Sequence, residues 1–207
     1  REREEEERRR VEFLRKIQEL RRMGFPESEM QDWTFANDDL SNERITNAMR
    51  NYVDNFDGLR KAGKGLLLYG TVGTGKTFAA CEVANALIDK GYPCMLAKLS
   101  DIARDIFDGK MSPHDLNKYA LLVLDDLMAE RKTEYMQEIV FNVIDSRCKA
   151  GLPLIVTSNL TAEAIKNPAD LAYQRIFSRL FEMTVPIEVT GKDKRQQKLK
   201  DDIAEVK

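Results

Sequence analysis

This sequence of 207 residues has only three cysteines, no long apolar run and no large excess of charge of either sign. The cysteines are far apart in apolar segments, which argues against a disulfide framework or a metal site and predicts reduced thiols in the core: Cys81, Cys94 and Cys148. No apolar run approaches the length of a membrane span, and the charged N-terminus is not a signal peptide. We therefore expect a cytoplasmic protein that does not contact membranes.

The charges nearly balance, with 33 Lys and Arg against 35 Asp and Glu. This balance gives no global signal for nucleic-acid binding, so any contact with DNA must come from a local basic patch. Hydrophobic residues make up 43% of the chain, which is typical of a globular protein with one substantial core. The first residue is Arg rather than Met, which leaves open a longer protein with an N-terminal partner-binding region.

We divide the chain into an extension, one folded domain and a tail. Residues 1–29 are rich in Arg and Glu, with an apolar residue recurring at helical spacing from Val11 to Leu20. They are interpreted as a charged helical extension, either a solvated linker or the stub of a domain that docks on a partner. Residues 30–195 form the folded domain, and residues 196–207 form a charged tail.

Apolar strands alternate with amphipathic helices through the folded domain. The strands are predicted at 66–69, 94–97, 119–126, 152–156 and 185–189, and the helices at 41–56, 78–89, 99–107, 133–150 and 168–183. Residues 58–64 are expected to form a turn, and Tyr135 is expected to face the core. This alternation predicts an α/β fold with a parallel five-stranded sheet and helices on both faces.

The most specific motif is a glycine-rich loop between the first strand and its helix. Residues 70–77 fit the P-loop pattern G-x-x-x-x-G-K-[ST], whose backbone N–H groups point at phosphates. We predict that it binds ATP or ADP, with Lys76 on the β- and γ-phosphates and the Thr77 hydroxyl on Mg²⁺. The nucleotide-binding residues predicted here are Gly70, Thr71, Val72, Gly73, Thr74, Gly75, Lys76, Thr77 and Phe78.

Two acids and an amide follow later strands and complete the predicted site. Asp125 and Asp126 end the third strand in the Walker B pattern. We expect Asp125 to hold Mg²⁺, directly or through water, and Asp126 to orient or activate the hydrolytic water. Asn159 follows the fourth strand at the same sheet edge, where it is either a sensor of the γ-phosphate or a cap of the next helix.

These motifs, with Thr-Ser-Asn-Leu at 157–160 and Ser-Arg-Leu at 178–180, resemble an AAA+ ATPase. More narrowly, roughly residues 30 to 195 resemble the bacterial and phage replicative helicase loaders of DnaC/DnaI type and the related transposition helper ATPase IstB. The resemblance implies a P-loop NTPase of AAA+ type with little or no helical lid. Many members carry Glu where this chain has Asp126, so the resemblance leaves the rate of hydrolysis in question.

Further site residues are implied by the resemblance. Arg179 matches the arginine finger that completes a neighbouring subunit's site, and Arg175 is a weaker match; the alternative is that both lie in surface ion pairs. Arg195 resembles a sensor II arginine acting on the phosphates in cis, and a solvated basic tail is the alternative. Trp33 and Phe35 are implied to lie near the adenine, or else to pack at the sheet edge.

The segment 98–110 lies where initiator-type AAA+ proteins insert a helix that contacts single-stranded DNA. Lys98, Arg104 and Lys110 are candidates for phosphate contacts, although three Asp residues offset their charge. The segment has no run of aromatic residues of the kind that stacks bases. An ordinary amphipathic crossover helix is therefore an equal alternative.

The function implied by the resemblance is ATP-dependent helicase loading. The protein would assemble with its own kind, hydrolyse ATP slowly, and deliver a DnaB-like replicative helicase to single-stranded DNA in bacterial or phage replication. Three alternatives stay open. They are an IstB-like transposition helper that binds duplex DNA, a P-loop small-molecule kinase, and a nucleotide-switched binding module with little turnover. A kinase would need a substrate pocket and an arginine-rich lid, and the sequence shows neither.

Overall fold

The sheet lies at the centre of the molecule, and all of its strands are parallel. The structure is a computed structural model that describes residues 2–127 and 133–194. The strand order is β2-β3-β4-β1-β5. The strands are β1 (Gly65–Tyr69), β2 (Cys94–Lys98), β3 (Leu121–Leu127), β4 (Leu154–Ser158) and β5 (Thr184–Glu188). Their carboxyl ends share one edge, where parallel α/β sheets bind ligands.

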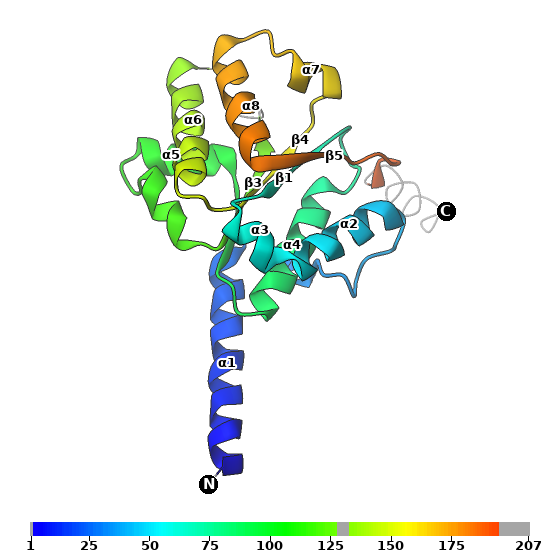
Figure 1. Cartoon of the computed structure of the whole chain (residues 1–207), viewed down its shortest axis with the longest axis vertical. Helices are drawn as coiled ribbons and strands as arrows, with labels where there is room; N and C mark the ends of the chain where they lie inside the picture. Colours follow the sequence, from blue (N-terminus) through cyan, green and yellow to red (C-terminus); the bar gives the residue numbers. More distant parts are fainter. Residues whose placement is uncertain (1, 128–132, 195–207) are drawn as a thin grey trace, which may run out of the picture.

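Helices cover both faces of this sheet (Figure 1). The first layer contains α1 (Glu2–Gly24), the 3₁₀ helix η1 (Ser28–Asp32), α2 (Glu43–Asp54), α3 (Phe56–Lys61) and α4 (Lys76–Asp89). The second contains α5 (Leu99–Phe107), the 3₁₀ helix η2 (Pro113–Lys118), α6 (Glu134–Lys149), α7 (Ala162–Lys166) and α8 (Leu171–Met183). The predicted five-stranded parallel sheet with helices on both faces is confirmed.

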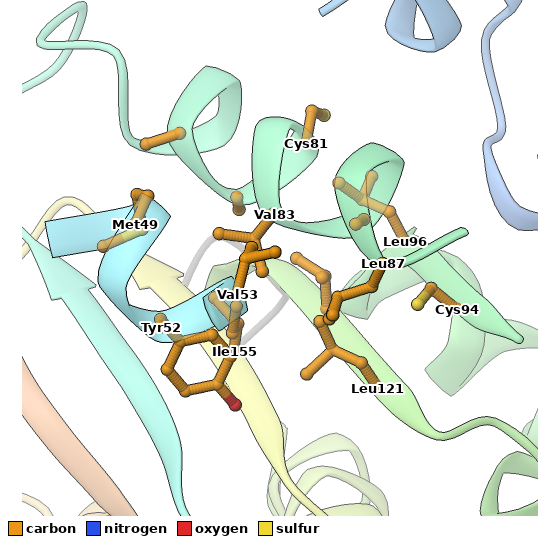
Figure 2. Packing of buried hydrophobic residues seen from close by; sticks show 14 of the residues in the cluster. Met49, Tyr52, Val53, Cys81, Val83, Leu87, Cys94, Leu96, Leu121 and Ile155 are labelled. Atoms are coloured by element: carbon orange, nitrogen blue, oxygen red, sulfur yellow. The ribbon is translucent and has the colours of Figure 1, made fainter. Parts of the chain in front are cut away.

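The core of the first layer forms between α4, α2 and the sheet (Figure 2). Val83 and Leu87 of α4 are fully buried, as are Met49 of α2 and Leu121 of β3. Burying one such side chain stabilises a fold by about 1.5–3 kcal/mol. This packing fixes α4 against the sheet, and it therefore fixes the loop that precedes α4.

Helix α1 reaches away from the rest of the molecule, and its N-terminal end is remote from the sheet (Figure 1). Ile17, in its second half, is buried against the body, whereas Val11 and Leu14 are 42% and 52% exposed. The second half is also held by an ion pair between Arg21 and Asp89. The division into an extension and a folded domain stays a prediction.

Several local expectations need correction. Residues 58–64 were expected to form a turn, but α3 covers most of that stretch because Phe56 is buried and anchors a short helix there. Tyr135, expected to face the core, is 49% exposed and packs on the ring of Phe107 at 5.3 Å between centroids. It lies in the first turn of α6.

The three cysteines are free thiols, and Cys81 and Cys94 are buried, as the sequence predicts. Within residues 2–127 and 133–194, the structure contains no helix with both the length and the apolar character of a membrane span.

Candidate active site

The P-loop joins β1 to α4 at the carboxyl edge of the sheet. Gly75 caps α4 in the left-handed region at φ 91°, and Gly73 has φ 78°. A side chain at either position would strain the backbone, which explains why the motif requires glycine there. The chain therefore turns sharply enough to bring the N-terminal end of α4 against the loop, and helix N-termini attract phosphate.

Lys76, the first residue of α4, is buried and folded back onto the loop. Its Nζ donates hydrogen bonds to the carbonyl oxygens of Gly70 at 3.1 Å and Thr71 at 2.7 Å. The Thr74 hydroxyl donates to the same Thr71 oxygen at 2.9 Å. The loop is thus closed on itself by its own polar groups, and the ammonium lies where a P-loop lysine can turn towards phosphate oxygens.

A network of hydroxyls surrounds the buried carboxylate of Asp125. Thr77 donates to its Oδ1 at 2.9 Å from α4, and Thr157 donates to the same oxygen at 2.6 Å from β4. Burial raises the pKa of Asp125, although the two hydroxyl donors oppose that rise. A cation bound nearby would stabilise the charged form of this carboxylate and offset the cost of its burial.

Asp126 is turned away from Asp125 by a bulge in β3. Leu124 pairs with Val156 and Leu127 with Ser158, so two residues of β3 face one residue of β4. Asp126 has φ 60°, and its N–H donates to the Thr157 hydroxyl at 3.0 Å. The bulge directs the two consecutive acids differently, so that Asp125 is buried while Asp126 is half-buried.

Asn159 lies beside Asp126, as their shared sheet edge predicts. Its Nδ2 donates to Asp126 Oδ1 at 3.2 Å. The following helix, α7, is capped by Thr161, whose hydroxyl accepts from the N–H of Ala164. Asn159 is therefore not the cap of α7, and its amide is available at the edge that holds the P-loop.

The chemistry of these donors fits Mg²⁺ bound together with a nucleotide. Mg²⁺ keeps several waters and takes one or two protein oxygens plus phosphate oxygens, rather than a dedicated cage of side chains. Thr77 and Asp125 offer such a pair, already in contact. In the described ranges, no three His, Cys, Asp or Glu side chains come together as a metal cage.

Aromatic residues lie on the other side of the loop. The ring of Trp33 is 5.8 Å from that of Phe78, in the first turn of α4. Phe35 lies under the guanidinium of Arg50 at 5.3 Å and is half-buried. The structure thus places Trp33 and Phe78 together near the P-loop, whereas Phe35, two residues after Trp33, packs against Arg50. Their contact with adenine stays a prediction.

The chain that follows β5 also runs along the P-loop. The N–H of Lys194 donates to the Gly73 oxygen at 3.0 Å, and its Nζ pairs with Asp39 at 2.9 Å. This hydrogen bond from Lys194, together with hydrogen bonds from Ser41, lowers the pKa of Asp39 to about 2. A Cβ on Gly73 would come within 2.0 Å of a carboxylate oxygen of Asp193. Residues 189–194 therefore connect the segment before the core to the loop.

Arg179 makes ion pairs within its own chain. Its Nε lies 3.1 Å from Asp145 of α6, and its Nη1 lies 2.9 Å from Glu182. Arg175, one turn earlier, stacks on the ring of Phe141 at 4.4 Å. Neither contact tests a role in a neighbouring subunit. Arg195 lies outside the described residues.

The cations of segment 98–110 are paired with acids. Arg104 pairs with Asp101 at 2.9 Å, Lys110 with Asp108 at 2.9 Å, and Lys98 with Glu27 at 3.6 Å. Most of the segment is α5, whose Ile102 is buried in the core. These contacts favour the amphipathic crossover helix, because the charges that would meet phosphates are already neutralised.

Two features of the site were missed from the sequence. The first is Thr157, which contacts both Asp125 and Asp126. This contact depends on the register of β3 against β4, which a single sequence does not reveal. The contact between Asp39 and Lys194 joins residues 155 positions apart and leaves no pattern in the sequence.

The family model described as IstB-like ATP binding protein matches residues 1–202. The chain belongs to this family. It is accordingly an AAA+ P-loop protein of an ATP-binding family, related to the DnaC and DnaI helicase loaders.

Curated relatives and a solved structure agree with this assignment. The replicative helicase loader DnaI of Bacillus subtilis is 26% identical over 210 aligned positions, covering 90% of this chain and 66% of that protein. The replicative helicase loader DnaC of Escherichia coli is 26% identical over 161 positions, covering 72% and 63%. The crystal structure of a DnaC helicase loader matches with a TM-score of 0.66 at 24% identity, covering 79% of this chain and 100% of that one. The chain thus spans less than two thirds of the length of these two curated relatives.

Proposed function

We propose that this protein is an ATP-hydrolysing helicase loader, which assembles with copies of itself and delivers a DnaB-like replicative helicase to single-stranded DNA. One observation carries the proposal: Lys76, the network around Asp125, and the Asp126–Asn159 pair converge at one sheet edge. The helicase loaders DnaI and DnaC among its relatives support the loading role.

Each residue of the site has a defined task in hydrolysis. Lys76 exchanges its two carbonyl hydrogen bonds for oxygens of the β- and γ-phosphates, and the loop N–H groups hold the same phosphates. Asp126 accepts a hydrogen bond from the attacking water, and Asn159 orients the Asp126 carboxylate. Thr77 and Asp125 would hold Mg²⁺, which would supply positive charge that neutralises the phosphates.

Arg179 completes the site of a neighbouring copy. To do so it leaves Asp145 and Glu182 and meets the phosphoryl group bound by the next subunit. Arginines supplied in this way accelerate phosphoryl transfer by about 10³–10⁵-fold in NTPases. Turnover is therefore slow in the isolated chain and rises when copies assemble.

Nucleotide binding is tested by Lys76→Ala, with the exposed Lys61→Ala as a matched control. We expect the Lys76 variant to lose at least tenfold in ATP affinity in a calorimetric titration, because the ammonium no longer meets the phosphates, while the control binds like the parent. Equal ATP affinity in Lys76→Ala and the parent would overturn the P-loop assignment.

The loading role is tested with a purified DnaB-like hexameric helicase and circular single-stranded DNA coated with single-strand-binding protein. We expect the protein and ATP to increase the amount of helicase on the DNA, and Lys76→Ala to fail. No gain in loaded helicase, in the presence of a stable complex between the two proteins, would contradict the role.

A second candidate is a transposition helper, which the IstB-like family match favours. It predicts ATP-dependent binding to duplex DNA and a complex with a transposase instead of a helicase. A nucleotide-switched binding module predicts tight ATP binding without turnover, which a steady-state phosphate-release assay distinguishes. Membership of the IstB-like family does not favour the small-molecule kinase.

A further inference from the structure

Residues 189–194, which follow β5, form a strap that is bonded to the P-loop. At its start, the N–H of Val189 donates to the Tyr69 oxygen at 2.8 Å, at the end of β1. At its end, the N–H of Lys194 donates to the Gly73 oxygen at 3.0 Å, inside the loop. The strap is therefore in contact with the strand–loop unit at both of its ends.

The segment before the core also holds the strap. The Nδ2 of Asn42 donates to the Thr190 oxygen at 2.7 Å, and the Nζ of Lys194 pairs with Asp39 at 2.9 Å. The same Nζ lies 5.8 Å from the centre of the Phe78 ring, in the first turn of α4. Asn42, Asp39 and Lys194 lie at the surface, and exposed contacts of this kind open locally at low cost.

Asp193 places a carboxylate against the phosphate-binding loop. A Cβ on Gly73 would come within 2.0 Å of Asp193 Oδ1 and 2.3 Å of its Cγ. Because a carbon–carbon bond of this kind is about 1.5 Å long, the Oδ1 lies no more than about 3.5 Å from the Gly73 Cα. The Asp193 side chain is half-buried, so solvent screens its charge only in part.

A phosphate held by the loop would meet this carboxylate at short range. The N–H groups of a P-loop, to which Gly73 belongs, point at the phosphates. Two anions a few ångströms apart repel each other, and the neighbouring cation, Lys194, is already paired with Asp39. In this position the strap therefore opposes the binding of phosphate.

We propose that the strap is an autoinhibitory device, in which Asp193 competes with the phosphates of the nucleotide for the P-loop. When ATP binds, repulsion moves the Asp193 carboxylate away and the hydrogen bond from Lys194 to Gly73 opens. ATP therefore binds more weakly than the loop alone would allow, and the strap reports whether phosphates are bound. This inference rests on the proposed nucleotide site and adds its regulation.

The first test compares ATP and ADP affinities of the parent and Asp193→Asn, which removes the charge and keeps the shape of the side chain. We expect the variant to bind ATP about tenfold more tightly than the parent, with a smaller gain for ADP, because the repulsion grows with the charge of the ligand. Asp108→Asn is the matched control, since Asp108 is an exposed acid that pairs with Lys110 after α5. It should bind both nucleotides like the parent.

The second test measures hydrogen exchange at the Lys194 amide in the parent protein, with and without ATP. Its N–H is bonded to Gly73 in this structure, so release of the strap should make it exchange about fivefold faster when ATP is bound. The amides of β5, which pair with β1, should not change.

The outcomes separate this inference from the nucleotide site itself. Equal or weaker ATP binding by a folded Asp193→Asn would overturn it, and so would unchanged or slower exchange at Lys194 in the presence of ATP. The exchange measurement uses the unmodified protein, so it decides the question even if Asp193→Asn does not fold. Binding by the variant alone would support complete autoinhibition. If neither protein binds ATP, the proposed function fails and the inference fails with it.

Discussion

At the scale of single residues, Thr157 controls the geometry of the two acids. Its hydroxyl donates to Asp125 and accepts from the N–H of Asp126, so one oxygen fixes both sides of the bulge. Thr157 is completely buried, and water is therefore not available to replace these bonds. Removing the hydroxyl leaves a buried N–H without an acceptor, which costs about 1–3 kcal/mol.

We expect Thr157→Val to lower ATP turnover at least tenfold, because Asp126 is released from the orientation that the bulge imposes. The substitution keeps the shape of the side chain, so the fold should persist, and Thr157→Ser should restore most of the activity. Turnover and circular dichroism on the same samples check both points. Turnover in Thr157→Val equal to that of the parent would show that the bulge does not need this hydroxyl.

Burial of Glu82 in α4 makes stability depend on pH. Its pKa is raised from 4.5 to about 8 in the folded protein, so the folded state binds a proton more tightly than the unfolded chain. Its stabilising contribution is present below pH 4.5 and is lost as the pH rises through about 8. In thermal unfolding, the gain in stability of Glu82→Gln over the parent should therefore be larger at pH 8 than at pH 5. A gain that is the same at both pH values contradicts the shift.

Residues within a local motif were predictable, whereas residues that depend on register were not. The P-loop residues are contiguous, and Asp125 and Asp126 end an apolar strand. Their spacing along the sequence is therefore enough to identify them. Thr157 and Glu82 acquire their roles from neighbours on other elements. A buried glutamate in a helix carries no signal in a single sequence.

At the scale of elements, α6 is joined to the sheet by a buried arginine. Arg147 is fully buried, and it donates to the carbonyl oxygens of Tyr119 at 2.9 Å and Pro153 at 2.6 Å, just before β3 and β4. A third bond reaches Leu116 in η2 at 3.3 Å. Burial lowers the pKa of Arg147 to about 10, so it stays charged at neutral pH.

Arg147→Ala should destabilise the fold by about 3 kcal/mol or more, because three carbonyl oxygens lose their donor, two of them fully buried. Lys149→Ala, on the same turn of α6, should change stability by less than about 1 kcal/mol, since its pair with Asp145 is exposed on the lysine side. Urea unfolding of both variants provides the comparison. Similar losses in the two would contradict the account.

The long elements were predictable from periodicity, and the short ones were not. The five strands and the helices of nine or more residues follow clear apolar patterns. In contrast, η1, η2, α3 and α7 have five or six residues each, which is too short for a period to be recognised. They depend on single anchors such as Phe56 and on the carbonyl contacts of Arg147.

At the scale of the whole molecule, the proposed site joins the P-loop of one chain to Arg179 of the next. Arg179 lies on α8, in the helical layer opposite α4, and in this structure it is held by Asp145 and Glu182. We propose that it acts in the site of a neighbouring copy rather than in that of its own chain. Activity should therefore require contact between copies.

A mixing experiment tests this central claim most directly. Asp126→Asn lacks the water-directing acid, Arg179→Ala lacks the finger, and Arg175→Ala serves as the control for a nearby arginine. We predict that Asp126→Asn and Arg179→Ala each hydrolyse ATP at least tenfold more slowly than the parent, and that their mixture recovers activity, because some interfaces then combine an intact site with an intact finger. Turnover of Arg179→Ala at the parent's rate, or no recovery in the mixture, would contradict the account.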